Sequence, residues 1–179
     1  MTNSTQQSIP ASTKSSVPIA AWLLGVSGLI PFVGLSLSVA VETPIERTFA
    51  ATALSFYGAI ILSFMSGVHW GLTMRGSSNA VTAGQSPIVN SSNAGKGPSV
   101  LQDVTLYGAS VFPALIAWFA LILLPTTWAM AAIAAAFAGL LVYDFAMIKR
   151  GYAPAWYALL RIPLTAVVVA SLALAAAVL

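Results

Sequence analysis

Three side chains that can carry charge lie inside long apolar stretches of this chain: His69, Asp144 and Arg161. Asp144 lies four residues before the end of a helix expected at about 128–148, and Arg161 lies five residues into the next helix, expected at about 156–178. At a rise of about 1.5 Å per residue, both lie roughly 6–8 Å inside the same membrane boundary. An unpaired charge at that depth costs a few kcal/mol, so we predict an ion pair between Asp144 and Arg161.

The predicted pair has two alternative roles. In the structural role, the pair joins two helices, or Arg161 instead extends to the lipid headgroups. In the functional role, the pair forms part of an ion or proton path. His69, at the end of a helix expected at about 50–72, lies at a similar depth. This histidine could hydrogen-bond to a neighbouring helix, relay protons with Asp144, or contact an anionic lipid headgroup together with Arg75. His69, Asp144 and Arg161 are therefore the candidate polar cluster.

Residues for other chemistry are scarce. The chain has no cysteine, one histidine and four acidic residues, so a metal centre is not expected, and a haem would find only one axial histidine. Ser63 and His69 lie about 240° apart around their helix and cannot form a nucleophile–base pair. Gly95-Lys96 lacks the glycine spacing of a phosphate-binding loop. We therefore expect no catalytic, cofactor-binding or metal-binding residues and predict that the protein is not an enzyme.

The composition is that of a membrane protein. Of 179 residues, 59% are hydrophobic and 6% are charged, against roughly 25% charged residues in soluble domains. Five apolar runs are long enough to span a bilayer, which needs roughly 20 residues, and none alternates with the period of a barrel strand. The prediction is an all-α polytopic bundle of five transmembrane helices over residues 18–179, at about 19–41, 50–72, 105–124, 128–148 and 156–178.

Two polar segments accompany the bundle. Residues 1–17 are rich in Ser, Thr, Gln and Pro and are expected to form a flexible tail, while residues 73–104 are expected to form a flexible cytoplasmic loop. With five helices, the N-terminus shares one side with the second and fourth connections. That side carries five basic residues, Lys14, Arg75, Lys96, Lys149 and Arg150. The other side carries only Arg47. The positive-inside rule predicts a cytoplasmic N-terminus and an outside C-terminus.

Small residues recur at every fourth position of the second run, which includes the segment 55–71. Such residues let the backbones of membrane helices approach closely, so we expect this stripe to pack against other helices and the second helix to be central. The helix-packing stripe consists of Ser55, Ala59, Ser63, Gly67 and Gly71.

Three segments together resemble one known family. They contain Gly-Val-His-Trp-Gly at 67–71, Val-Phe-Pro-Ala-Leu at 111–115 and Trp-Tyr-Ala-Leu-Leu-Arg at 156–161. The chain resembles, over about residues 19–178, the bacterial membrane family called domain of unknown function 3429, which is similar to transmembrane protein 69. The resemblance implies a five-helix integral membrane protein, placed in a bacterial plasma (inner) membrane, and it implies no activity, substrate or cofactor.

The predicted function is a non-catalytic scaffold, assembly or accessory subunit that acts through helix–helix contacts. The alternative is a small transporter or channel that uses His69, Asp144 and Arg161 near the cytoplasmic face. The expected partners are the lipid bilayer and either another membrane protein or further copies of the chain, and nucleic acid is not expected. A water-accessible polar cavity reaching the middle of the membrane would favour the transporter.

Overall fold

The computed structural model describes five helices and, within the residues it describes, no strand. It describes the backbone of residues 19–82, 100–149 and 156–179. It describes the side chains of residues 19–71, 108, 110–149 and 156–179. The predicted tail at 1–17 and most of the predicted loop lie outside the described residues. The helices are α1 (Ile19–Val41), α2 (Pro44–Thr82), α3 (Val100–Leu123), α4 (Thr126–Lys149) and α5 (Trp156–Val178).

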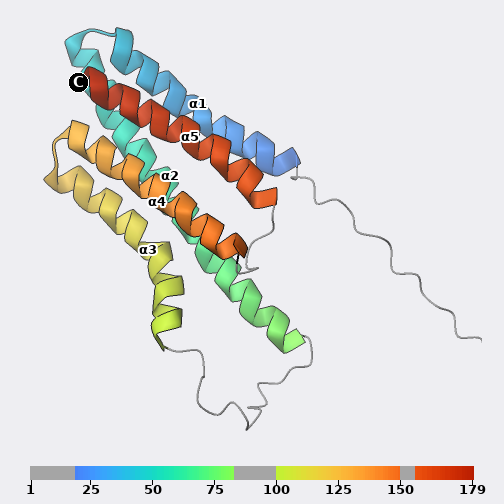
Figure 1. Ribbon diagram of the computed structural model, residues 1–179. Coiled ribbons are helices and arrows are strands. Elements are labelled where there is room, and N and C mark those ends of the chain that lie inside the picture. The colour runs from blue at the N-terminus through green and yellow to red at the C-terminus, as the bar shows by residue number, and fades with distance from the viewer. Residues whose placement is uncertain (1–18, 83–99, 150–155) are drawn as a thin grey trace, which may run out of the picture.

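The helices run up and down, and α2 lies at the centre of the bundle. Among the described residues it contacts each of the other four helices, whereas α1 contacts α2 and α5, and α3 contacts α2 and α4. Figure 1 shows α1 and α5 side by side, with α3 at the opposite edge. The α1–α2 and α3–α4 connections lie at the same end of the bundle as the C-terminus. The predicted central place of the second helix therefore agrees with the observed packing.

The limits of α2 differ from the prediction at both ends. It begins at Pro44 rather than near residue 50, and it continues to Thr82 rather than ending near 72. Thr43 precedes a proline at the first helical position, and its hydroxyl donates a hydrogen bond to Glu46 at 2.8 Å. This Thr-Pro-Ile-Glu sequence has the spacing of a capping box and is the signal for the early start. The sequence at the far end of α2 is polar, which indicates that the chain has left the membrane but not that the helix has ended. A helix that has already formed can continue into water, because adding a residue costs far less free energy than starting a helix.

The other helix limits lie closer to the prediction. Helices α1 and α5 occupy the predicted ranges. The predicted helices at 105–124 and 128–148 leave residues 125–127 between them, whereas α3 ends at Leu123 and α4 begins at Thr126, so the observed connection is Leu124 and Pro125. Helix α3 begins at Val100, so its first turns fall inside the segment that the sequence assigned to the loop. Pro113 lies inside α3, which changes direction between its two halves in Figure 1. A proline removes one helical hydrogen bond and bends a helix.

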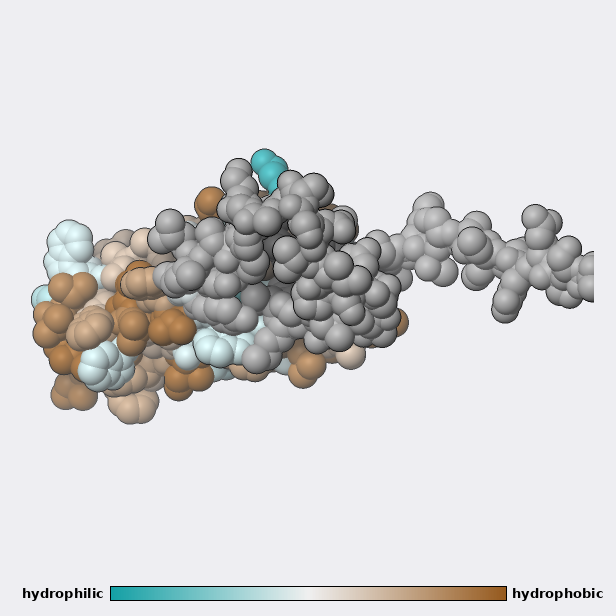
Figure 2. Space-filling model, turned by 90° about the horizontal axis from the view of Figure 1, so that it is seen from below, coloured by the Kyte–Doolittle hydropathy of each residue, from teal (hydrophilic) through white to brown (hydrophobic). Residues whose placement is uncertain are grey.

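Four helices are long and apolar enough to cross a membrane. They are Ile19–Val41, Pro44–Gly71, Thr126–Lys149 and Trp156–Val178, and α3 adds a shorter apolar stretch, Ser110–Leu123. Large apolar side chains point outward in every helix, including Leu24, Phe64, Trp118 and Leu159. Figure 2 shows mostly hydrophobic side chains on the visible flanks of the described helices. Such a surface needs lipid as its solvent, so this is an integral membrane protein that crosses the bilayer several times.

The packed core runs along the axis of α2. Its buried side chains come from all five helices and include Phe32, Leu54, Ala117, Ile133 and Leu172. Phe32 packs edge-on against both Tyr57 and Phe137, with ring centroids 4.9 and 6.2 Å apart. This core holds α2, α4 and α5 in register and so determines where their polar side chains meet.

Candidate functional site

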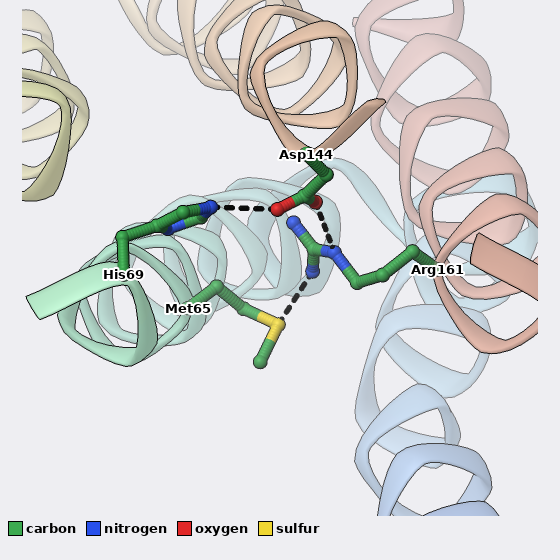
Figure 3. A network of polar contacts seen from close by, with 4 residues as sticks. All are labelled: Met65, His69, Asp144 and Arg161. Atoms are coloured by element: carbon green, nitrogen blue, oxygen red, sulfur yellow. Dashed lines mark hydrogen bonds and ion pairs between the residues drawn. The ribbon is translucent and has the colours of Figure 1, made fainter. Parts of the chain in front are cut away.

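The three residues of the candidate polar cluster meet inside the bundle, although they come from α2, α4 and α5 (Figure 3). The carboxylate of Asp144 lies between the other two. His69 Nε2 lies 2.6 Å from Asp144 Oδ1, and Arg161 Nε donates a hydrogen bond to Asp144 Oδ2 at 2.6 Å. The structure therefore contains the ion pair predicted from the equal depth of Asp144 and Arg161, and it adds His69 to it.

The cluster is buried because each residue lies on the inward face of its helix. Asp144 follows the buried Leu140 by one turn, and Arg161 precedes the buried Thr165 by one turn. The exposed fractions are 0% for His69, 1% for Asp144 and 3% for Arg161. Removing two charges from water costs several kcal/mol for each ion, and direct contact between opposite charges offsets much of that cost. The charges of Asp144 and Arg161 thus balance each other inside the bundle.

Aromatic and sulfur-containing side chains surround the cluster. Arg161 Nη1 donates to Met65 Sδ at 2.6 Å, and the guanidinium carbon lies 5.9 Å from the centre of the Tyr157 ring. The Tyr143 ring packs edge-on against His69, with centroids 5.1 Å apart. Sequence reasoning missed these three neighbours. The available signal was spacing, since Met65 precedes His69 by four residues and Tyr157 precedes Arg161 by four, which puts each pair on one helix face.

The cluster can hold helices together, and its histidine can carry a proton. In the part of the chain that the structure describes, no three His, Cys, Asp or Glu side chains lie close enough to share a metal ion. Both oxygens of Asp144 are engaged by His69 and Arg161. Of the alternatives for His69, the structure contains a hydrogen-bonding contact with a neighbouring helix. The alternative with Arg75 falls on a side chain outside the described residues.

The expected helix-packing stripe is only partly buried within the bundle. Ser55 is buried and Ala59 is half-buried, but Ser63, Gly67 and Gly71 are exposed. Residues four apart drift by about 40° per step, so the stripe rotates by about 160° from its first to its last member. The stripe therefore packs within the bundle at Ser55 and Ala59, and contact of Ser63, Gly67 and Gly71 with a partner helix stays a prediction.

The close approach of helices occurs at a residue outside the stripe. A Cβ built on Gly58 would lie 3.2 Å from Ile133 Cγ2, whereas one on Gly67 or Gly71 would meet nothing within 4 Å. Gly58 lies on the buried face of α2, together with Leu54 and Leu62. These three residues are also four apart, but over only two steps the set drifts by about 80° and stays on one side of the helix, whereas the five members of the stripe turn by about 160°.

Comparison with known proteins assigns the chain to a family. Residues 17–177, which include α1 to α4 and all of α5 except Val178, match the family described as Protein of unknown function (DUF3429). The chain belongs to this family. It is 35% identical over 158 residues to "Transmembrane protein 69" of Xenopus tropicalis, an alignment that covers 87% of this chain and 53% of that protein. The chain thus spans about half the length of this curated relative. No solved structure matches it.

The DUF3429 description names no activity. The printed name of the Xenopus relative says that it is a transmembrane protein, in keeping with the apolar helices of this chain. The function of this DUF3429 member therefore has to be argued from its buried polar cluster and from the cavities beside its helices.

Proposed function

We propose that this protein is a non-catalytic accessory or assembly subunit that binds an apolar transmembrane helix of another membrane protein. The observation that carries the proposal is a groove between α3 and α4. It comprises two adjoining hollows of about 550 and 490 Å³, which share Phe112, Ile116 and Ala132 in their walls.

The wall of the groove on α4 is made of small residues. Ala132, Ala135, Ala136 and Gly139 line it, and Gly139 has open space where a Cβ would stand. Two pairs, 132 with 136 and 135 with 139, have the four-residue spacing of small residues that lets a second helix approach closely. Among the side chains that the structure describes, no charged one lines either hollow. An apolar helix fits this groove because the walls of both hollows are mainly apolar.

A different protein fits the groove better than a second copy of this chain. In a twofold dimer the same patch faces itself, so two hollows would meet and leave a void between them. Two exposed aromatic side chains of α3, Phe112 and Phe119, line the hollows. Their rings can pack against a partner helix whose side chains fill the hollow.

The rival function, a small transporter or channel, has less support. Such a protein needs a water-accessible route lined by polar groups. The cavities that reach the cluster are lined mainly by apolar side chains, on the Tyr143 side and on the Arg161 side alike. The engagement of Asp144 by two neighbours favours a clamp between helices over an ion-binding step.

The accessory role is tested with a photo-crosslinking amino acid placed at Ala135 of the full chain in native membranes. We expect it to capture one discrete membrane protein, and Gly139→Leu to reduce that capture at least about tenfold by filling the groove. The matched control is Gly34→Leu, because Gly34 is also exposed and has open space around it, but lies on α1. Capture of lipid alone, of a second copy of this chain, or of a partner insensitive to Gly139→Leu contradicts the proposal.

We also propose that the membrane is a bacterial inner membrane and that the N-terminus is cytoplasmic. The support is the excess of Lys and Arg on the side of the N-terminus, together with the family resemblance. Reporters fused after Leu179 test the orientation: a periplasmic reporter such as alkaline phosphatase is expected to be active and a cytoplasmic fluorescent reporter inactive. The reverse pattern overturns the orientation and leaves the accessory role standing.

A further inference from the structure

The carboxylate of Asp144 lies between two side chains that can each carry a positive charge (Figure 3). Arg161 donates from Nε to Oδ2 at 2.6 Å, and His69 Nε2 lies at the same distance of 2.6 Å from Oδ1. All three residues are buried, with at most 3% of each exposed. One positive charge neutralises a buried carboxylate, and a second one beside it would stay uncompensated at a large cost in free energy. The histidine and the arginine therefore compete to be the counterion of Asp144.

The arrangement in the structure assigns a neutral ring to His69. With Arg161 as its counterion, Asp144 is an anion that accepts hydrogen bonds and has no proton to donate. The hydrogen of the short contact is therefore assigned to His69 Nε2. A second proton binds at Nδ1 and makes the ring an imidazolium, a change that histidine undergoes near neutral pH.

Few other ionisable groups face the histidine. Tyr143 of α4 packs edge-on against the His69 ring, and Tyr157 of α5 stands beside the guanidinium. Helix α1 contains no ionisable residue, and the described side chains of α3 include none. The ionisable residues of α3 are Asp103 and Tyr107, whose side chains lie outside the described residues. Within the described residues, the three members of the cluster therefore set its charge.

A crevice gives the Arg161 side chain room to move. It has a volume of about 300 Å³, lies between α1, α2 and α5, and has Arg161 among its lining residues. Ala21 and Tyr157 also line it, and both lie in the first turn of their helices. The crevice therefore extends from the level of the cluster to the end of the bundle at which α1 and α5 begin.

The position of Arg161 on α5 favours movement toward that end. Arg161 lies in the second turn of α5, and helical side chains point toward the N-terminus of their helix. An arginine this close to a membrane surface can extend its charged group to the headgroups. The Tyr157 ring lies one turn nearer the surface, 5.9 Å from the guanidinium carbon, and can hold the cation over its face.

We propose that proton uptake by His69 exchanges the counterion of Asp144. A proton from water binds His69 Nδ1, and the imidazolium neutralises the carboxylate. The guanidinium of Arg161 then leaves Asp144 and moves along the crevice toward the surface. The buried cluster has no net charge before or after the exchange, because one positive charge enters as the other leaves.

The exchange changes which helices the cluster joins. Asp144 of α4 is bonded to α2 and α5 in the structure, and after the exchange it is bonded to α2 alone. The cluster is thus a proton-sensitive switch in the contact between α4 and α5. It does not involve the α3–α4 groove, so either proposal can fail without the other.

The test uses the purified full chain in lipid nanodiscs, isolated through a tag that contains no histidine. His69 is the only histidine of the chain, so ¹⁵N-labelled histidine reports on this ring alone and distinguishes its neutral tautomers from the imidazolium. Methionine labelled with ¹³C at its methyl group reports on Arg161, because Arg161 Nη1 donates to Met65 Sδ. The variant Met65→Leu assigns that methyl signal.

The two signals are expected to change together. As the pH falls from about 8 to about 5, the ring of His69 is expected to change from the Nε2–H form to the imidazolium. The Met65 methyl signal is expected to shift with the same midpoint, because the guanidinium leaves the sulfur when it leaves Asp144.

Two variants move the titration in opposite directions. Arg161→Gln removes the competing cation, so the proton affinity of His69 is expected to rise at least about tenfold. Asp144→Asn removes the anion, so His69 is expected to stay neutral down to about pH 5. The matched control is Arg47→Gln, at the opposite end of α2, which is expected to leave the titration unchanged. A thermal unfolding curve for each variant separates altered titration from lost folding.

Three outcomes overturn the exchange. A ring of His69 that does not titrate between about pH 8 and about pH 5 in the unmodified chain shows that the cluster takes up no proton. A ring that titrates while the Met65 methyl signal stays fixed shows that Arg161 remains at Asp144. Equal titration of Arg161→Gln and Arg47→Gln shows that the two cations do not compete. The first two outcomes concern the unmodified chain and do not depend on the folding of any variant.

Discussion

Helices α2, α4 and α5 meet at two levels in opposite ways. At one level Gly58, Ile133 and Leu172 pack together without charge, and at the other His69, Asp144 and Arg161 form the polar cluster. The two levels are eleven residues apart on each of the three helices, which is about 16 Å along the axis. The same three helices are therefore joined once by contact of backbone with side chain and once by charge.

The difference reflects what a membrane offers to hold helices together. Lipid tails are as apolar as leucine, so burying Ile133 or Leu172 against another helix brings little hydrophobic gain, and the gain comes from close packing. Gly58 permits that packing by leaving room for Ile133. At the other level Asp144 and Arg161 attract each other strongly, and removal of either one would leave the other charge buried without a counterion. The apolar level should therefore respond to small changes in volume, and the polar level to loss of a charge.

The largest effect is expected from Asp144→Leu. This change leaves the charge of Arg161 buried without a counterion, so we expect a loss of about 3–5 kcal/mol in the free energy of unfolding. Reversible unfolding of the purified protein in mixed micelles, monitored by circular dichroism, measures it. A loss below about 1 kcal/mol would show that the polar level does not depend on charge pairing.

A double variant separates the lost charge from the lost contact. Arg161→Leu alone is expected to destabilise the protein, and Arg161→Leu with Asp144→Leu is expected to recover part of the stability, because neither buried charge is then unpaired. The comparison is between the double variant and each single variant in the same micelles. If the double variant is no more stable than the less stable single one, the two residues are not a coupled pair.

A smaller effect is expected at the apolar level, from Gly58→Ala. The added methyl group would lie 3.2 Å from Ile133 Cγ2 and force a shift in a packed region. Gly67→Ala is the matched control, because a Cβ there meets nothing within 4 Å and alanine favours the helix. We expect Gly58→Ala to be less stable than Gly67→Ala by about 1 kcal/mol, measured by the same unfolding assay. Equal stability would mean that the close approach at Gly58 does not hold the helices together.

Much of the polar cluster could be predicted from depth along the helices. Asp144 and Arg161 lie at matching distances from the ends of neighbouring antiparallel helices, and charge in a low-dielectric medium needs a partner. The sequence predicts the depth of His69 but not that its side chain points to Asp144, because the rotation of α2 about its axis depends on how the helices pack. The stripe shows the limit of spacing arguments, since Ser63 and Gly67 have the expected size and lie on the exposed side.

By itself the sequence determined that this is a membrane protein of five helices, because so apolar a chain can satisfy its backbone in lipid only through helices. It also determined that any buried charge needs a counterion. Tertiary structure alone decided which faces meet: Gly58 against Ile133, and His69 with Asp144 rather than toward lipid. The groove along α4 and the crevice beside Arg161 were also decided there, because the shape of a cavity depends on how several helices fit together at once.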